Sequence, residues 1–182
     1  MTNDADTIAL SKALDADERA AAIHEAGHAV VAHALGADVS FVEMDLGTGN
    51  GASCSRNLGD NSKTLAVLVA GYKAELAVAA HELNLSKMLA AHAVRPKRDY
   101  QQMQELLLRL PELERLAVLV EGFTLADEKL KANADVVNRI ADALFARRFE
   151  DKARIEGARW MCCSQPFIAA GEFGPADVAM LR

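Results

Sequence analysis

The chain has few cysteines: its 182 residues include only Cys54, Cys162 and Cys163. This odd number, with two cysteines adjacent, does not suit a disulfide framework, because neighbouring cysteines rarely bridge each other. The polar, acidic start MTNDADT also lacks the basic region of a secretory signal peptide. We therefore expect a cytoplasmic protein in a reducing compartment.

Features of nucleic-acid-binding and membrane proteins are also scarce. The 26 acidic residues outnumber the 20 basic ones and give a net charge of -6, whereas phosphate backbones are bound by clustered Lys and Arg. Aromatic residues make up 5% of the chain, too few for a platform that stacks single-stranded bases. No window approaches the run of about 20 apolar residues that spans a bilayer. We expect neither nucleic acid as a partner nor membrane insertion.

Residues that favour helices are abundant. Hydrophobic residues make up 51% of the chain, and its high content of alanine and leucine favours helices over sheets. A length of 182 residues suits one well-buried core. We therefore expect a mainly α-helical domain over residues 17–163, preceded by a polar segment over residues 1–16 and followed by a C-terminal tail over residues 164–182.

Capping and stop signals indicate where the helices lie. Asp15 or Asp17 can cap a helix through RAAAIHEAGHAVVAHAL, and Gly36 then supplies a left-handed stop. Further helices are expected from Asn61 or Ser62, from Asp99 to about Leu110, and after Pro111 to about residue 160.

A short β element is expected between the first two helices. In VSFVEMDL, Val39 and Phe41 alternate with polar residues, and Val42 and Met44 can join them. The glycine-rich GTGNGAS then interrupts the pattern before a shorter segment through Cys54. This pattern predicts a small hairpin or sheet beside the first helix.

An H-E-x-x-H motif lies in the middle of that first helix, as His24-Glu25-Ala26-Gly27-His28. Residues four apart project from one helix face, so the two imidazoles can bind one zinc ion. Glu25 can take a proton from a zinc-bound water and return it to a leaving amine. Gly27, unusual in a helix interior, suggests that another backbone approaches closely.

A catalytic zinc needs a third protein ligand, which must be found further along the chain. The metzincin extension would require glycine and histidine where this chain has Val31 and Ala34, so it is excluded. Spacing alone leaves the alternatives open. The remaining candidates are Glu75, Glu82, His81, His92 and Asp99.

Several segments resemble one family. HEAGHAVVAHAL (24–35) is similar to the zinc helix of the FtsH-type proteases, in which an AAA ATPase is fused to a zinc peptidase domain. VSFVEMDLGTGNGASCS (39–55) resembles the family's strand and substrate-binding edge, and LVAGYKAEL (68–76) its glycine-plus-Ala-Glu helix. RDYQQMQELL (98–107) stands where the family has the helix whose aspartate is the third zinc ligand, and residues 130–160 resemble its closing helices.

The resemblance implies a helical zinc-metallopeptidase fold with His24, His28 and Asp99 as zinc ligands and Glu25 as the general base. Glu75 is then an alternative ligand, or a partner that receives the other ring hydrogen of a ligand histidine. The implied substrate-binding residues can form an exposed strand edge to which an extended peptide adds, or only a structural hairpin. They are Gly51, Ala52, Ser53, Cys54 and Ser55.

The sequence departs from the family by lacking a phosphate-binding G-x-x-x-x-G-K-[ST] loop and a membrane anchor. We therefore expect the peptidase module alone: a zinc endopeptidase that cuts unfolded or flexible polypeptides and does not itself use ATP. A second copy of the chain, or a separate ATPase or regulator, is a further candidate partner. The alternative function is a catalytically silent metal-binding module that recognises or regulates a protein partner.

Overall fold

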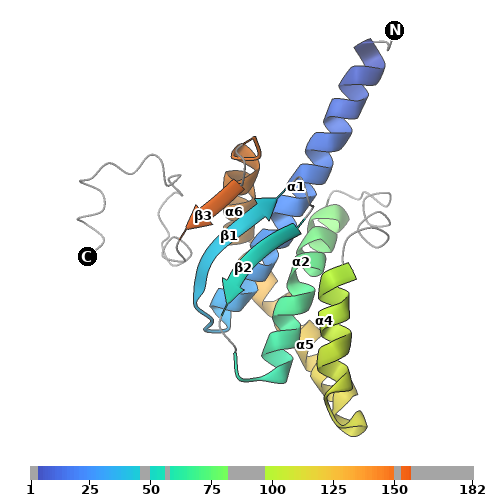
Figure 1. Ribbon diagram of the computed structural model, residues 1–182, viewed down its shortest axis with the longest axis vertical. Helices are drawn as coiled ribbons and strands as arrows, with labels where there is room; N and C mark the ends of the chain where they lie inside the picture. The colour runs from blue at the N-terminus through green and yellow to red at the C-terminus, as the bar shows by residue number, and fades with distance from the viewer. Residues whose placement is uncertain (1–3, 46–49, 56–57, 82–96, 150–152, 157–182) are drawn as a thin grey trace, which may run out of the picture.

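Five helices and three strands make up the part of the chain that the computed structural model describes, residues 4–45, 50–55, 58–81, 97–149 and 153–156 (Figure 1). They are, in chain order, α1 (Asp4–Ala34), β1 (Val39–Asp45), β2 (Asn50–Ser55), α2 (Asn61–His81), α4 (Lys97–Leu108), α5 (Glu112–Ala132), α6 (Ala134–Ala146) and β3 (Ala153–Glu156). The expected fold, mainly α-helical with a small β element beside the H-E-x-x-H helix, is confirmed. The tail at 164–182 lies outside the described residues.

Helix α1 is longer than the capping signals predicted. It begins at Asp4, so the expectation that Asp15 or Asp17 caps it is wrong, and most of the segment 1–16 is helical. The reason is that TIALSKALDADER contains neither proline nor glycine and offers good helix formers throughout. The first turns of α1 project beyond the other described elements (Figure 1). The predicted stop is confirmed, because Gly36 has a φ of 90°.

The three strands form one antiparallel sheet in the order β2-β1-β3. A register shift between Val39 and Val42 marks a bulge. Because of it, Val39, Val42 and Met44 are all buried, whereas Phe41 lies under the guanidinium of Arg154. The predicted alternation that paired Phe41 with Val39 is therefore wrong.

Strand β3 was not expected, because helices were predicted to continue to about residue 160. Instead α6 ends at Ala146, and β3 pairs with β1 through Phe41↔Glu156 to Met44↔Ala153. Ala153 and Ile155 are buried and Arg154 between them is not, which is the alternation of a half-buried strand.

The starts of α2 and α5 follow local capping chemistry. Helix α2 begins at Asn61, as expected, and Asp60 caps it, because the backbone N–H of Lys63 donates to Asp60 Oδ1 over 2.8 Å. The Ser62 hydroxyl donates instead to Glu121 Oε2 on α5 over 2.7 Å. Pro111 precedes the first turn of α5 as predicted, and its carbonyl accepts from the N–H of Glu114.

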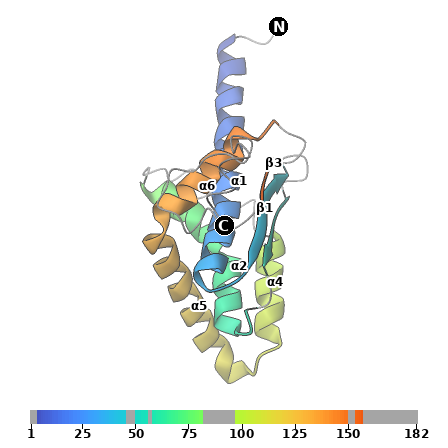
Figure 2. The ribbon, with the colours of Figure 1, turned by 90° about the vertical axis from the view of Figure 1, so that its left-hand side faces the viewer.

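Helix α1 lies at the centre of the core. Figure 2 shows the sheet on one side of α1 and α6 on the other, and α2 also packs along α1. The buried side chains between these elements are almost all apolar; the largest fully buried ones are Leu65, Ile140, Leu144, Ile155, Val31, Val39 and Val42. Four polar residues are also buried: His24, His28, Ser62 and Glu75. Three of these four lie together, because the side chains of His28 and Glu75 each contact His24.

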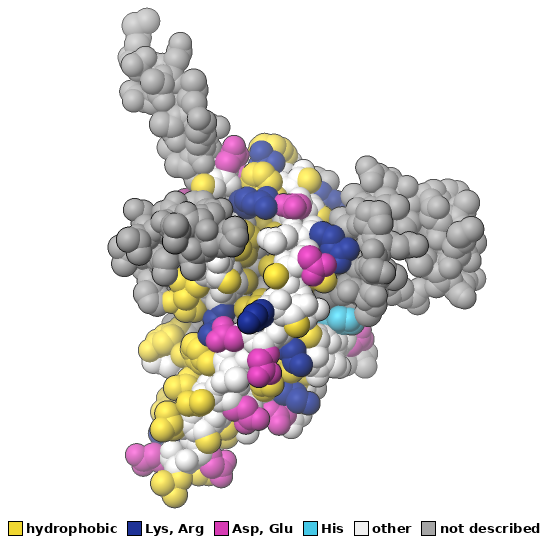
Figure 3. Space-filling view, turned by 180° about the vertical axis from the view of Figure 1, so that it is seen from behind, with side chains coloured by type: hydrophobic (Ala, Val, Ile, Leu, Met, Phe, Trp, Pro, Cys, Tyr) yellow, Lys and Arg dark blue, Asp and Glu magenta, His cyan; other side chains and the backbone are white. Residues whose placement is uncertain are grey.

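Within the described ranges, every helix is too short or too polar to cross a lipid bilayer. Hydrophobic side chains gather over the end of the molecule where α4 leads into α5 (Figure 3). The large exposed ones there are Leu108, Leu113, Leu116 and Val120. This patch lies at the opposite end of α4 from Asp99.

Candidate metal centre

Helix α1 places two imidazoles together in the core. His24 and His28 are one helical turn apart, and each is only 8% exposed. Their ring centroids are 4.6 Å apart and the rings are inclined at 77°. This edge-on arrangement brings the two Nε2 atoms within 3.0 Å of each other.

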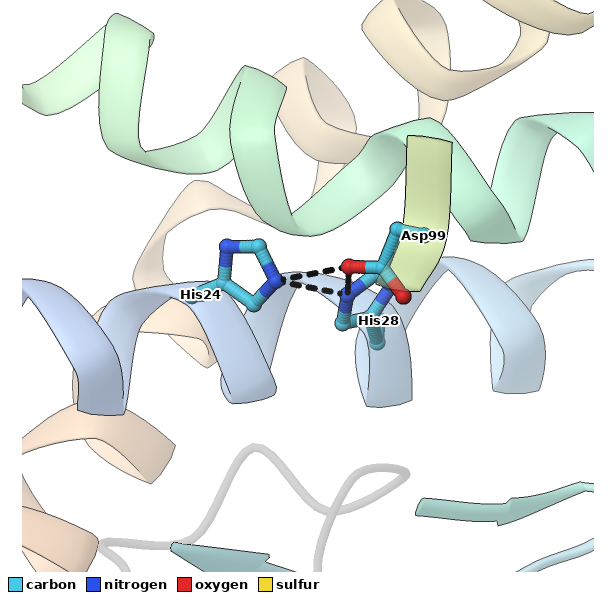
Figure 4. Close-up of side chains that lie close together, drawn as sticks. All are labelled: His24, His28 and Asp99. Atoms are coloured by element: carbon cyan, nitrogen blue, oxygen red, sulfur yellow. Dashed lines mark hydrogen bonds and ion pairs between the residues drawn. The ribbon is translucent and has the colours of Figure 1, made fainter. Parts of the chain in front are cut away.

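Asp99 completes the cluster from the first turn of α4. Its Oδ2 lies 3.1 Å from His24 Nε2 and 3.2 Å from His28 Nε2 (Figure 4). The Asp99 side chain is 25% exposed, more than either imidazole, so the cluster is most accessible on its side. The structure thus brings together the three residues that the family resemblance implied as ligands, although 71 positions separate Asp99 from His28.

Helix α2 holds both rings by their other nitrogens. His24 Nδ1 is 2.6 Å from Glu75 Oε1, and His28 Nδ1 is 2.7 Å from the Val67 carbonyl oxygen. A carbonyl oxygen can only accept a hydrogen bond, so His28 Nδ1 carries the hydrogen and the Nε2 of a neutral His28 presents its lone pair to the cluster. The Glu75 carboxylate selects the same tautomer for His24.

This arrangement leaves three acceptor atoms facing one another at about 3 Å, which is unfavourable unless a proton or a cation lies between them. Burial lowers the pKa of His24, but hydrogen bonds to Asp99 and Glu75 outweigh it and raise that pKa to about 10. Burial likewise raises the pKa of Asp99, but hydrogen bonds to His24 and His28 outweigh it and hold that pKa well below its usual range. The first shift favours a positive charge on the His24 ring, and the second keeps the Asp99 carboxylate negatively charged.

The cluster fits a divalent cation by three observations. Two imidazole nitrogens and one carboxylate oxygen are a donor set that suits zinc and leaves a fourth position open, as catalytic sites require. The donor separations of 3.0, 3.1 and 3.2 Å approach the roughly 3.3 Å between ligands of tetrahedral zinc with bonds of about 2.0 Å. Gly71 faces the two Nε2 atoms without a side chain, which leaves space beside them.

Glu25 follows His24 on α1 and is partly buried. Burial raises the pKa of its carboxyl group, and the nearby His28 and His24 only partly oppose this rise. Among the described residues, the Glu25 carboxylate has no hydrogen-bond or ion-pair partner. A partly buried carboxylate with a raised pKa, beside a candidate cation site, has the properties of a general base.

The other residues named from the sequence lie at the edges of this site or outside the description. Glu75 contacts His24 Nδ1, the ring nitrogen that faces away from the cluster, and is not one of its three members. This position fits a residue that accepts the other ring hydrogen of a ligand histidine, and does not fit a third ligand. Residues 51–55 belong to β2, which is an edge strand because β1 is its only described neighbour in the sheet. The side chains of His81, Glu82 and His92 lie outside the described part of the chain.

Two contributors were missed by the sequence reasoning. The Val67 carbonyl fixes His28, but a backbone acceptor has no signature in a sequence. Gly71 borders the cluster, and the sequence offered two signals for it: a glycine inside a predicted helix, and the resemblance of residues 68–76 to the family's glycine-plus-Ala-Glu helix. The close backbone approach predicted at Gly27 is confirmed: a Cβ there would lie 2.8 Å from the carbonyl oxygen of Ala70.

Comparisons with known proteins add no family assignment. No family model matches the sequence, and no curated protein matches it significantly.

Proposed function

We propose that this chain is a zinc-dependent endopeptidase that hydrolyses unfolded or flexible polypeptides and does not itself use ATP. The observation that carries the proposal is the convergence of His24 Nε2, His28 Nε2 and Asp99 Oδ2 near the Glu25 carboxyl group, whose pKa is raised. The resemblance of residues 24–35 to the zinc helix of the FtsH-type proteases supports the same function.

Each residue of the site has a role in this proposal. His24, His28 and Asp99 hold the zinc ion, while Glu75 and the Val67 carbonyl keep the two rings in orientation. Zinc, when bound, supplies Lewis acidity that polarises the scissile carbonyl and acidifies water. Glu25 accepts the proton of the attacking water and passes it to the leaving amine, a task that its raised pKa suits.

The polypeptide substrate is proposed to bind along β2. This strand pairs with β1 on one side, and no other described strand pairs with its second edge. An extended peptide can add there through main-chain hydrogen bonds, which are largely independent of side-chain sequence. Binding of this kind explains a preference for unfolded segments over folded proteins.

The test compares cleavage of a labelled, unfolded protein by zinc-loaded wild type and by Glu25→Gln, with bound zinc quantified in both. Glu128→Gln is the matched control, because it makes the same change at an exposed position on α5. We expect about one zinc per chain in all three proteins, with cleavage by wild type and the control and a loss of at least about a hundredfold in Glu25→Gln.

Two other outcomes contradict the proposal in different ways. If all three proteins hold zinc and none cleaves, the peptidase function is wrong and the silent metal-binding module is favoured. If none binds zinc, the metal site itself is wrong.

A further inference from the structure

The second helix presents three consecutive turns to the cluster. Val67, Gly71 and Glu75 are four residues apart and so lie on one face of α2. Val67 meets His28 and Glu75 meets His24, so α2 runs antiparallel to α1 at this contact. Gly71 is the midpoint of this face and lies opposite the gap between the two imidazoles.

A side chain at position 71 would collide with the metal-facing atoms of both rings. A Cβ built there would lie 2.6 Å from His24 Nε2, 2.6 Å from His28 Nε2 and 2.7 Å from His24 Cδ2. Each of these distances is shorter than real Cβ contacts, so the rings would have to move. Movement is opposed because Glu75 and Val67 hold the opposite nitrogens at 2.6 and 2.7 Å.

Backbone conformation does not explain this glycine. Gly71 lies inside α2, and among the described glycines only Gly36 and Gly59 have positive φ. Packing between helix backbones does not explain it either. The three atoms nearest to a Cβ at position 71 all belong to imidazoles, whereas at Gly27 the nearest include backbone atoms of Ala70.

We propose that Gly71 is a positioning residue for the metal: its missing side chain lets the two Nε2 atoms converge on one cation while α2 holds both rings from behind. This inference rests on the proposed function for the identity of the ion. It adds that α2 covers one side of the site with the Val67 carbonyl, the bare backbone of Gly71 and the Glu75 carboxylate.

The test compares wild type with Gly71→Ala and with Gly122→Ala as the matched control. Gly122 is also buried in a helix, and a Cβ there would collide with the Leu65 side chain, away from the cluster. Zinc affinity is measured by competition with a chelator, coordination geometry by the visible spectrum of the cobalt-substituted protein, and folding by circular dichroism and thermal unfolding of the metal-free protein.

We expect Gly71→Ala to lose at least about tenfold in zinc affinity and to change the cobalt spectrum, as for other residues that orient metal ligands. Its metal-free form should still fold but unfold at or somewhat below the wild-type temperature, because displacing the two rings offsets the roughly 1 kcal/mol that alanine gains over glycine in a helix. Gly122→Ala should also lower the stability, but its zinc affinity and cobalt spectrum should be those of wild type once it is folded. Wild-type zinc affinity in Gly71→Ala would overturn the inference, as would a loss of zinc that merely parallels unfolding.

A second measurement separates this inference from the proposed function. Nitrogen-15 spectra of the histidine rings in metal-free protein report the two Nδ1 hydrogen bonds directly. If wild type binds no zinc, the proposed function fails. The positioning role then stands if Gly71→Ala shifts the ring signals of His24 and His28, and it falls if those signals are unchanged.

Discussion

Asp99 and Glu75 both contact His24, but they do so on opposite ring nitrogens, and this difference can be measured. Asp99→Asn and Glu75→Gln each remove one negative charge and keep the shape of the side chain. Asp99 Oδ2 contacts the Nε2 atoms of both histidines, whereas Glu75 Oε1 contacts only His24 Nδ1. The first variant therefore removes a zinc ligand, and the second only weakens the orientation of a ligand.

The expected magnitudes follow from these positions. Loss of a partner that orients a ligand lowers metal affinity about 10- to 100-fold, so Glu75→Gln should weaken zinc binding by about 1.4 to 2.8 kcal/mol. Asp99→Asn replaces one of three protein ligands with a neutral amide, and its loss should exceed about 100-fold.

The assay is a zinc titration in competition with a coloured chelator, with bound metal confirmed by native mass spectrometry. Glu128→Gln again serves as the exposed control and should bind like wild type. Circular dichroism of the metal-free variants shows that a loss of affinity is not a loss of fold. If Glu75→Gln loses zinc and Asp99→Asn retains it, the roles are reversed and our assignment of the third ligand is wrong.

Three further outcomes are expected. The pKa of His24 rises from 6.5 to about 10 on folding, so its stabilisation of the metal-free protein is complete below pH 6.5 and is lost as the pH rises through about 10. The free energy of unfolding from urea titrations should fall across this window by at most about 1.4 kcal/mol per pH unit. Saturating zinc requires a neutral His24 and should abolish this decline. If the stability of the metal-free protein does not change with pH in this window, the raised pKa of His24 is contradicted. Asp60→Ala removes the cap of α2 and should cost about 1 kcal/mol in the same assay, with Asp38→Ala, an exposed site before β1, as the comparison. Gly36→Ala forces alanine to a φ of 90° and should lower the free energy of unfolding by about 1 kcal/mol or more. An unchanged urea midpoint would refute the left-handed stop at this position.

The parts of the site that lie within one helix could be predicted from the sequence. His24 and His28 are four residues apart on a segment with strong helical pattern, so their convergence requires only that the helix forms. Asp99 is different, because its position depends on how α4 packs against α2 and α5. Spacing alone left five candidate ligands, and only the resemblance singled out Asp99.

Much of what the sequence did not reveal depends on neighbours or on backbone groups. The bulge between Val39 and Val42, which arises from pairing with β2, turns Val42 and Met44 toward the core in place of Phe41. Strand β3 has only four residues, too few for a period of two to stand out beside the helical segment that precedes it. The extension of α1 to Asp4 was missed because two aspartates that can cap a helix lie in its interior instead.

The central strand of the sheet takes its two neighbours from very different distances along the chain. β2 begins five positions after β1 ends, whereas β3 pairs Arg154 with Glu43, 111 positions earlier. During synthesis, β1 therefore keeps one edge unpaired until almost all of the described chain has emerged, and the sheet is completed late. A recombinant fragment that ends with α6 would expose this edge permanently, and an unpaired edge strand invites pairing with other chains. Expression of the domain should accordingly include residues 153–156, or the shortened product is expected to aggregate.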